Sequence, residues 1–69
     1  MMHMEEGSLR IRKLLEHWME HNDEHIARFL EVSGEAEKLG LKETSNSLRL
    51  AAETSGEVSK HLRKALNSM

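Results

Sequence analysis

Residues 36–41 read Ala36-Glu37-Lys38-Leu39-Gly40-Leu41, and they separate two long segments that have the periodicity of helices. Gly40 suits the left-handed backbone position that follows a helix C-terminus, and Leu41 would then pack on Ala36, as in a Schellman motif. This stretch therefore predicts that a first helix ends at about residue 39 and that the chain reverses direction at residues 40–41.

Before this turn, side chains recur at alternating spacings of four and three, which is typical of one face of a helix. Ser8 is a suitable N-cap, so we expect a first helix over about 9–39, preceded by a flexible leader over 1–7. The predicted face consists of Ile11, Leu15, Trp18, Asn22, His25, Phe29, Val32 and Ala36.

After the turn, a second face with the same spacing predicts a helix over about 43–67. Its start is open, because residues 44–47 offer several capping side chains. This face consists of Leu41, Thr44, Leu48, Ala51, Ser55, Val58, Leu62, Ala65 and Met69. Two long helices and a short turn predict an all-α, antiparallel two-helix hairpin that forms a single domain over 8–69.

The first helix is apolar over a wide arc, since Leu14, Met19, Ile26 and Leu30 flank its predicted face on both sides. One partner helix cannot cover so wide an arc, and soluble monomers avoid a long exposed apolar stripe. We therefore expect a homodimer that closes a four-helix bundle.

The composition limits the class of protein. The chain has 69 residues, no cysteine and only 3% aromatic residues, so it is one small domain without disulfide bonds or thiolate metal sites. Its net charge is −2, so no overall field attracts it to nucleic acid or to a membrane. The first residues lack the basic and apolar blocks of a signal peptide, so we expect a cytoplasmic protein.

Three histidines, His17, His21 and His25, follow one another at strict four-residue spacing and so lie along one side of the first helix. We refer to them as the histidine ladder. In an antiparallel hairpin, His61 and Glu57 of the second helix are expected to approach His17 and His21. This set of three imidazoles and a carboxylate suits Zn²⁺, Ni²⁺ or Co²⁺.

A structural interpretation of the same segment is favoured over the metal site. Polar residues in a bundle seam often serve to fix register and partner choice. Asn22, His25, Ser55 and Ser59 would then form one hydrogen-bonded layer, with His25 close to the core.

Two other sequence patterns that resemble metal sites give weaker support for metal binding. The runs 17–21 and 21–25 both fit H-x-x-E-H, a zinc-peptidase pattern, but a hairpin of this length offers neither the large cleft nor the third ligand of such an enzyme. Met1-Met2-His3 would form a square-planar Cu²⁺ or Ni²⁺ chelate if Met1 is retained. An accidental leader is the simpler interpretation of these three residues.

Six cations are predicted to gather at the end of the hairpin opposite the turn, and we call them the basic pole. They are Arg10, Arg12, Lys13, Lys60, Arg63 and Lys64. Cations at the start of the first helix oppose its dipole, which hints at an anionic partner. A solvated face is the simpler interpretation, because no nucleic-acid motif accompanies the cations.

The run from His17-Trp18 through His21-Asn22 to His25, followed by Leu39-Gly40-Leu41 and an Ala-rich second helix, resembles an uncharacterised family of small prokaryotic helical hairpins. That family has a similar H-W-x-x-H-N-x-x-H run, and the resemblance covers about residues 9–67. It implies the hairpin and no particular chemistry. This chain departs from the family in the serines of its second helix, where Glu is more usual.

We expect a non-enzymatic helical module for interaction or oligomerisation, because no nucleophile and base stand together in a cleft. The expected partner is a second copy of the chain. The alternative is a histidine-based protein that binds or senses Zn, Ni or Co. A more distant alternative is an anion or nucleic-acid binder that uses the basic pole.

Overall fold

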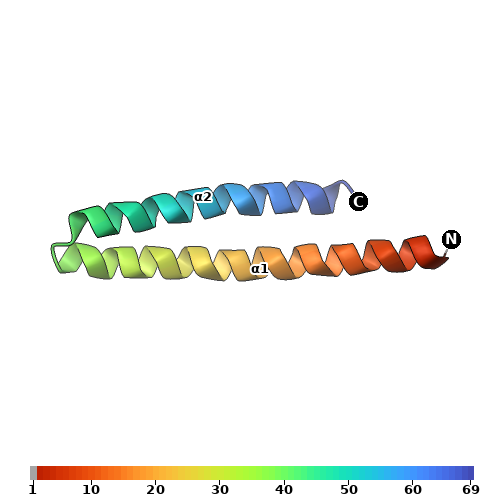
Figure 1. Cartoon of the computed structure of the whole chain (residues 1–69), viewed down its shortest axis with the longest axis horizontal. Helices are drawn as coiled ribbons and strands as arrows, with labels where there is room; N and C mark the ends of the chain where they lie inside the picture. The colour runs from red at the N-terminus through yellow and green to blue at the C-terminus, as the bar shows by residue number, and fades with distance from the viewer. Residues whose placement is uncertain (1) are drawn as a thin grey trace.

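The computed structural model describes residues 2–69, with side chains described from Glu6 onward, and it consists of two antiparallel helices (Figure 1). Helix α1 spans Met2–Lys38 and helix α2 spans Lys42–Asn67. The predicted all-α hairpin is confirmed. Within the described residues, neither helix has an apolar stretch long enough to cross a membrane.

Helix α1 begins several residues earlier than predicted. Residues 2–8 continue the helix, so Ser8 lies inside it rather than capping it, and the described part of the predicted leader is helical. Methionine and glutamate are good helix formers, and no proline interrupts them. Because α1 is longer than α2, its N-terminal end extends beyond the end of α2 (Figure 1).

The turn has the predicted Schellman geometry. Gly40 has a φ of 79°, the left-handed conformation in which glycine has no steric cost. The Leu41 N–H donates to the Ala36 carbonyl at 2.9 Å, and the Gly40 N–H donates to the Glu37 carbonyl at 3.0 Å. Leu41 then serves as the N-cap residue of α2 without a side-chain cap hydrogen bond. The turn itself is therefore closed by backbone hydrogen bonds, without a side-chain cap.

The two helices meet along faces that differ in part from the predicted ones. We call the residues of this helix–helix interface the contact face. On α1 it consists of the buried or half-buried Leu15, Met19, Asn22, Ile26, Phe29, Ser33 and Ala36. On α2 it consists of Ser45, Leu48, Ala52, Ser55, Ser59, Leu62 and Leu66.

On α2 the contact keeps the predicted Leu48, Ser55 and Leu62, but its other residues are each one position after a predicted one. Ser45, Ala52 and Ser59 are buried, whereas the predicted Thr44 and Val58 are exposed. The prediction followed the larger apolar side chains. The helices instead meet at small side chains, which allow their backbones to approach closely.

Two glycines test the backbone conformation of α1 and of the turn. Gly34 is exposed in α1, and a Cβ there would meet no neighbouring atom within 4 Å. Gly34→Ala should raise the free energy of unfolding by about 0.5–1 kcal/mol, because alanine has the higher helix propensity. Gly40→Ala should lower it, because the left-handed φ is strained for alanine. Urea unfolding at one fixed protein concentration measures both, and equal effects of the two variants would contradict the turn geometry.

Candidate functional site

The histidine ladder lies on α1 and is exposed along its whole length. The ring centroids of His17 and His21 are 5.9 Å apart, with the rings tilted by 56°. The rings of His21 and His25 are stacked, with centroids 4.7 Å apart and an interplanar angle of 24°. His25 also approaches Phe29, at a centroid distance of 6.0 Å. The ladder is therefore a row of neighbouring imidazoles that remain accessible to water.

The prediction that His25 lies close to the core is wrong for the hairpin. His25 is exposed, and the next residue, Ile26, is half-buried in the contact face. The α1 contact keeps the predicted Leu15, Asn22, Phe29 and Ala36 but takes Met19, Ile26 and Ser33 in place of Trp18, His25 and Val32, so the contact is centred less than one position away from the predicted face and His25 lies beside it. His25 is not part of the hydrogen-bonded layer.

The predicted four-ligand metal set is not assembled in the single chain. Among the described residues, no three His, Cys, Asp or Glu side chains are grouped so that they could hold a metal ion. His61 is nine residues from the buried Ala52, about two and a half helical turns, so it points away from α1. Glu57 instead forms an exposed ion pair with Lys60, at 3.3 Å.

A shallow surface hollow does lie beside the ladder. Two imidazoles and two carboxylates line it, those of His17, His21, Glu20 and Glu24. All four residues are on α1 and all four are exposed. The hollow therefore gathers residue types that bind metals, but without a preformed ligand set.

Three of the four residues predicted to form a polar layer lie together at the contact face. The Asn22 Nδ2 donates to the Ser55 carbonyl at 2.6 Å and to the Ser59 Oγ at 2.8 Å. The Ser59 hydroxyl donates to Asp23 Oδ1 at 2.7 Å, so Asp23 occupies the role that the sequence assigned to His25. We call Asn22, Asp23, Ser55 and Ser59 the central polar cluster. It joins the two helices near their middle.

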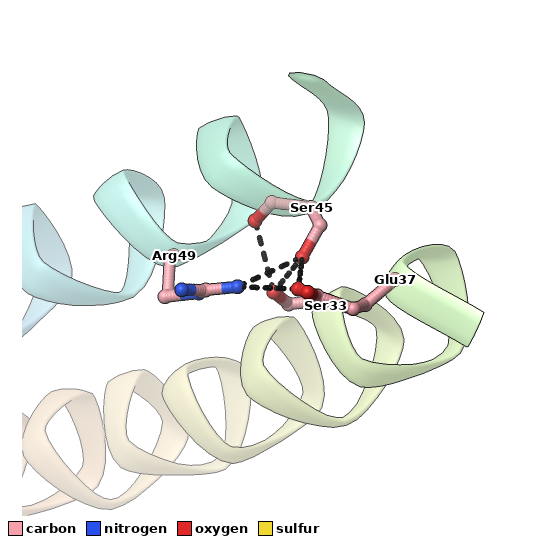
Figure 2. Close-up of polar contacts among 4 residues, drawn as sticks. All are labelled: Ser33, Glu37, Ser45 and Arg49. Atoms are coloured by element: carbon pink, nitrogen blue, oxygen red, sulfur yellow. Dashed lines mark hydrogen bonds and ion pairs between the residues drawn. The ribbon is translucent and has the colours of Figure 1, made fainter. Parts of the chain in front are cut away.

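A second polar cluster, near the turn, was not predicted (Figure 2). The Ser33 hydroxyl lies 2.9 Å from both the carbonyl oxygen and the Oγ of Ser45. The Ser45 hydroxyl donates to Glu37 Oε2 at 3.2 Å, and Arg49 donates to the same oxygen at 2.8 Å. Ser45 is fully buried, with 0% of its surface exposed. We call these four residues the turn cluster.

The sequence contains a signal for the turn cluster. Ser33 and Glu37 are four residues apart on α1, and Ser45 and Arg49 are four apart on α2, so each pair lies on one side of its helix. Ser33 and Ser45 are also equally distant from Leu39, close to the glycine of the turn, as expected for facing residues of an antiparallel hairpin.

The basic pole lies at the open end of the hairpin, where α1 begins and α2 ends (Figure 1). Its six residues are exposed. Arg10 and Lys13 line an open hollow together with Leu9, Leu14 and Glu6, a mixed surface rather than a concentrated anion site. The Met1-Met2-His3 pattern lies outside the residues whose side chains the structure describes.

Asn22 gives a test of the central polar cluster. Asn22→Ala removes both hydrogen bonds across the helix contact and should lower the free energy of unfolding by about 1–3 kcal/mol. Asn46→Ala is the matched control, because Asn46 is exposed on α2 and should be nearly neutral. Chemical denaturation at fixed protein concentration measures the free energy of unfolding of both variants. An unchanged free energy of unfolding in Asn22→Ala would contradict a stabilising role of the central polar cluster.

Ser45 tests the close approach of the helices at the turn cluster. Ser45→Leu places a large side chain where no surface is exposed, so it should lower the free energy of unfolding by about 2–4 kcal/mol. Ser47→Leu, at an exposed position two residues away, should change it by about 0.5 kcal/mol or less. Thermal and urea unfolding of both variants would show whether the contact requires a small side chain.

The comparisons with known proteins agree with an uncharacterised family. The family model described as a domain of unknown function, DUF8180, matches residues 11–69. An uncharacterized protein of Archaeoglobus fulgidus is 40% identical over 58 residues, which cover 84% of this chain and 92% of that protein. No solved structure matches the chain. The resemblance to an uncharacterised family is thus confirmed, and the chain belongs to the family described as domain of unknown function DUF8180.

Proposed function

We propose that the chain is a non-enzymatic interaction module that pairs with a second copy of itself to close a four-helix bundle. The observation that carries this proposal is the position of the apolar side chains that the hairpin leaves outside its own contact. Among them, Trp18 and Val58 are exposed on one side of the hairpin, the side that also carries the half-buried Leu14, Val32 and Ala51. Leu30 is exposed on the opposite side, which carries most of the charged residues.

The position of these side chains follows from the contact face. On α1 the residues one position before a contact residue include Leu14, Trp18, His21, His25 and Val32, and two charged residues, Arg28 and Glu35, also lie on this side. On α2 they include Thr44, Ala51, Val58 and Ala65, and the polar Ser47, Thr54 and His61 also precede contact residues. Because the helices are antiparallel and face each other, the same angular offset on both leads to the same side of the hairpin. We use the name apolar face for nine residues of this side: Leu14, Trp18, His21, His25, Val32, Thr44, Ala51, Val58 and Ala65.

The residues one position after a contact residue form the opposite side. Most of them are charged, and they include Glu16, Glu20, Asp23, Glu37, Arg49, Glu53, Lys60 and Arg63. Ala27 and the exposed Leu30 also lie on this side. Charged side chains of both signs remain favourably hydrated there. The apolar face therefore gains more from burial by a second copy than the more highly charged side does.

The exposed area of the hairpin supports association. The chain has an accessible surface of 5625 Å². A compact monomer of its mass, 7.9 kDa, would expose about 4400 Å². The excess is somewhat larger than the roughly 800 Å² that each partner contributes to a standard protein interface. A face-to-face dimer would therefore bring the exposed area per chain close to that of an ordinary globular protein.

The hairpin has little core of its own. Leu15, Ala36 and Ala52 are its buried hydrophobic residues among those described. Trp18 is 49% exposed and Val58 is 45% exposed. Burial of such side chains contributes about 1.5–3 kcal/mol each when complete, so a second copy would supply much of the stability that the single chain lacks.

A binding role is preferred to a catalytic one because of the shape of the surface. The hollows on the described part of the chain are open and lie along exposed helix sides. Catalytic groups gain most of their effect in sites that exclude water. A long two-helix rod of 58 × 14 × 11 Å offers a docking face more readily than such a site.

Val58 provides the central test. Val58→Glu places a charge on the apolar face and should shift the chain from dimer to monomer at micromolar concentration in sedimentation equilibrium. Leu50→Glu is the matched control: Leu50 is 60% exposed on the same helix but points away from α1, so its variant should remain dimeric.

Circular dichroism should show that both variants remain helical, because both positions are exposed. A monomeric wild-type chain at micromolar concentration, or equal effects of the two substitutions, would contradict the proposed face. As the only tryptophan, Trp18 should also report the dimer directly, by a red shift of its fluorescence as the protein is diluted.

A further inference from the structure

The stacked pair of the histidine ladder lies at the middle of the apolar face. On α1 this face extends from Leu14 to Val32, and its midpoint falls between His21 and His25. The two rings are neighbours, with centroids 4.7 Å apart, and both are exposed in the single chain. A dimer formed through this face would bury polar imidazole nitrogens, which is costly unless they gain a partner.

The charge distribution favours one orientation of the second copy. At the open end, residues 6–16 and 57–69 contain the six cations of the basic pole and three carboxylates, those of Glu6, Glu16 and Glu57. At the turn end, residues 31–53 contain five carboxylates and three cations. An antiparallel dimer places the positive end of each hairpin over the negative end of the other, whereas a parallel dimer places both positive ends together.

The antiparallel arrangement has its two-fold axis across the hairpin, perpendicular to the helices. Such an axis places α1 of one copy on α1 of the other, running in opposite directions. Residues at the midpoint of the face then meet their own counterparts. His21 and His25 of both copies therefore converge at the centre of the interface, as four imidazoles from two helices.

We propose that His21 and His25 of two copies together bind one transition-metal ion at this centre. The ion belongs to the class that prefers imidazole nitrogen, Zn²⁺, Ni²⁺ or Co²⁺, and four imidazoles suit a tetrahedral Zn²⁺ or Co²⁺ site. This inference rests on the proposed dimer. It also agrees with the single chain, in which no three ligand side chains among the described residues are grouped to hold an ion. The site is complete only when the second copy supplies its pair.

His17 and His61 have no part in the proposed site. His17 is one turn further along the ladder, toward the outer side of α1, where it lines the hollow together with Glu20, His21 and Glu24. His61 points away from α1 on the other helix. Both are exposed histidines and therefore serve as matched controls for the loss of an imidazole.

The experiment uses the full chain without an affinity tag. All proteins carry His3→Ala, which removes the imidazole of the amino-terminal chelate as a competing site. After treatment with EDTA, ZnCl₂ is titrated by calorimetry, and the dimer dissociation constant is measured by sedimentation equilibrium with EDTA and with Zn²⁺. We expect one ion for two chains. At free Zn²⁺ near 100 times its Kd, the dimer dissociation constant should fall by about 100-fold.

The variants identify the ligands. His21→Ala and His25→Ala should each abolish the effect of Zn²⁺ on dimerisation, and His17→Ala and His61→Ala should leave it unchanged. Co²⁺ bound to the dimer should give the intense visible absorption of a tetrahedral ion, and His25→Ala should remove it.

The contrary outcomes are distinct. One ion for each chain, with dimerisation unaffected and binding lost in His17→Ala, would overturn the shared site in favour of a chelate on a single helix. A dimer that forms in EDTA and does not respond to Zn²⁺ would overturn this inference but leave the proposed function intact. A monomer both in EDTA and in Zn²⁺ would overturn both.

Discussion

The close contact between α1 and α2 is the constraint on which the rest of the structure depends. Ser45, Ala52 and Ser59 stand seven residues apart on α2, and all three are buried against α1. Small side chains allow the two backbones to approach, and their hydroxyl groups can bond across the contact. Such a contact buries little apolar surface. The larger apolar side chains are therefore left beside it, and the hairpin is narrow, with a Cα radius of gyration of 16.4 Å against about 11 Å for a compact domain of this length.

The polar groups within this contact fix how the helices align. The central polar cluster joins Asn22 to Ser55 and Ser59, and the turn cluster joins Ser33 to Ser45. If α2 slid along α1 by one turn, these groups would lose their partners while staying at the contact, at a cost of about 1–3 kcal/mol for each unpaired group. No buried side-chain polar atom among the described residues lacks a partner in the observed register. Hydrogen bonding thus supplies the specificity that a contact of small side chains lacks.

The same alignment divides the outer surface into two unlike sides. Most of the charged residues next to the contact follow a contact residue, whereas Leu14, Trp18, Val32, Ala51 and Val58 precede one, so one side of the hairpin is more apolar than the other. Along its length it also has a positive open end and a turn end with an excess of carboxylates. The placement of His21 and His25 on the apolar face follows from this geometry. A histidine pair at an otherwise apolar site is a chemical feature that burial alone does not explain, which is why a shared metal ion is the natural proposal for it.

Two helices, the turn between them and their antiparallel pairing could be predicted from the sequence, whereas the start of the first helix could not. These features depend on local chemistry: Gly40 accepts the left-handed backbone of the Schellman motif, and the long helical periodicity on either side leaves a hairpin as the only arrangement. The sequence also identified Asn22, Ser55 and Ser59 as residues that lie together. Only the tertiary structure decided which side of each helix makes the contact. One position is a rotation of about 100°, and both alternatives have helical spacing, so periodicity cannot distinguish them. The preference for small, hydrogen-bonding residues over larger apolar ones resolved the choice. It placed Ile26 rather than His25 in the contact, moved His61 away from the ladder and assembled the turn cluster.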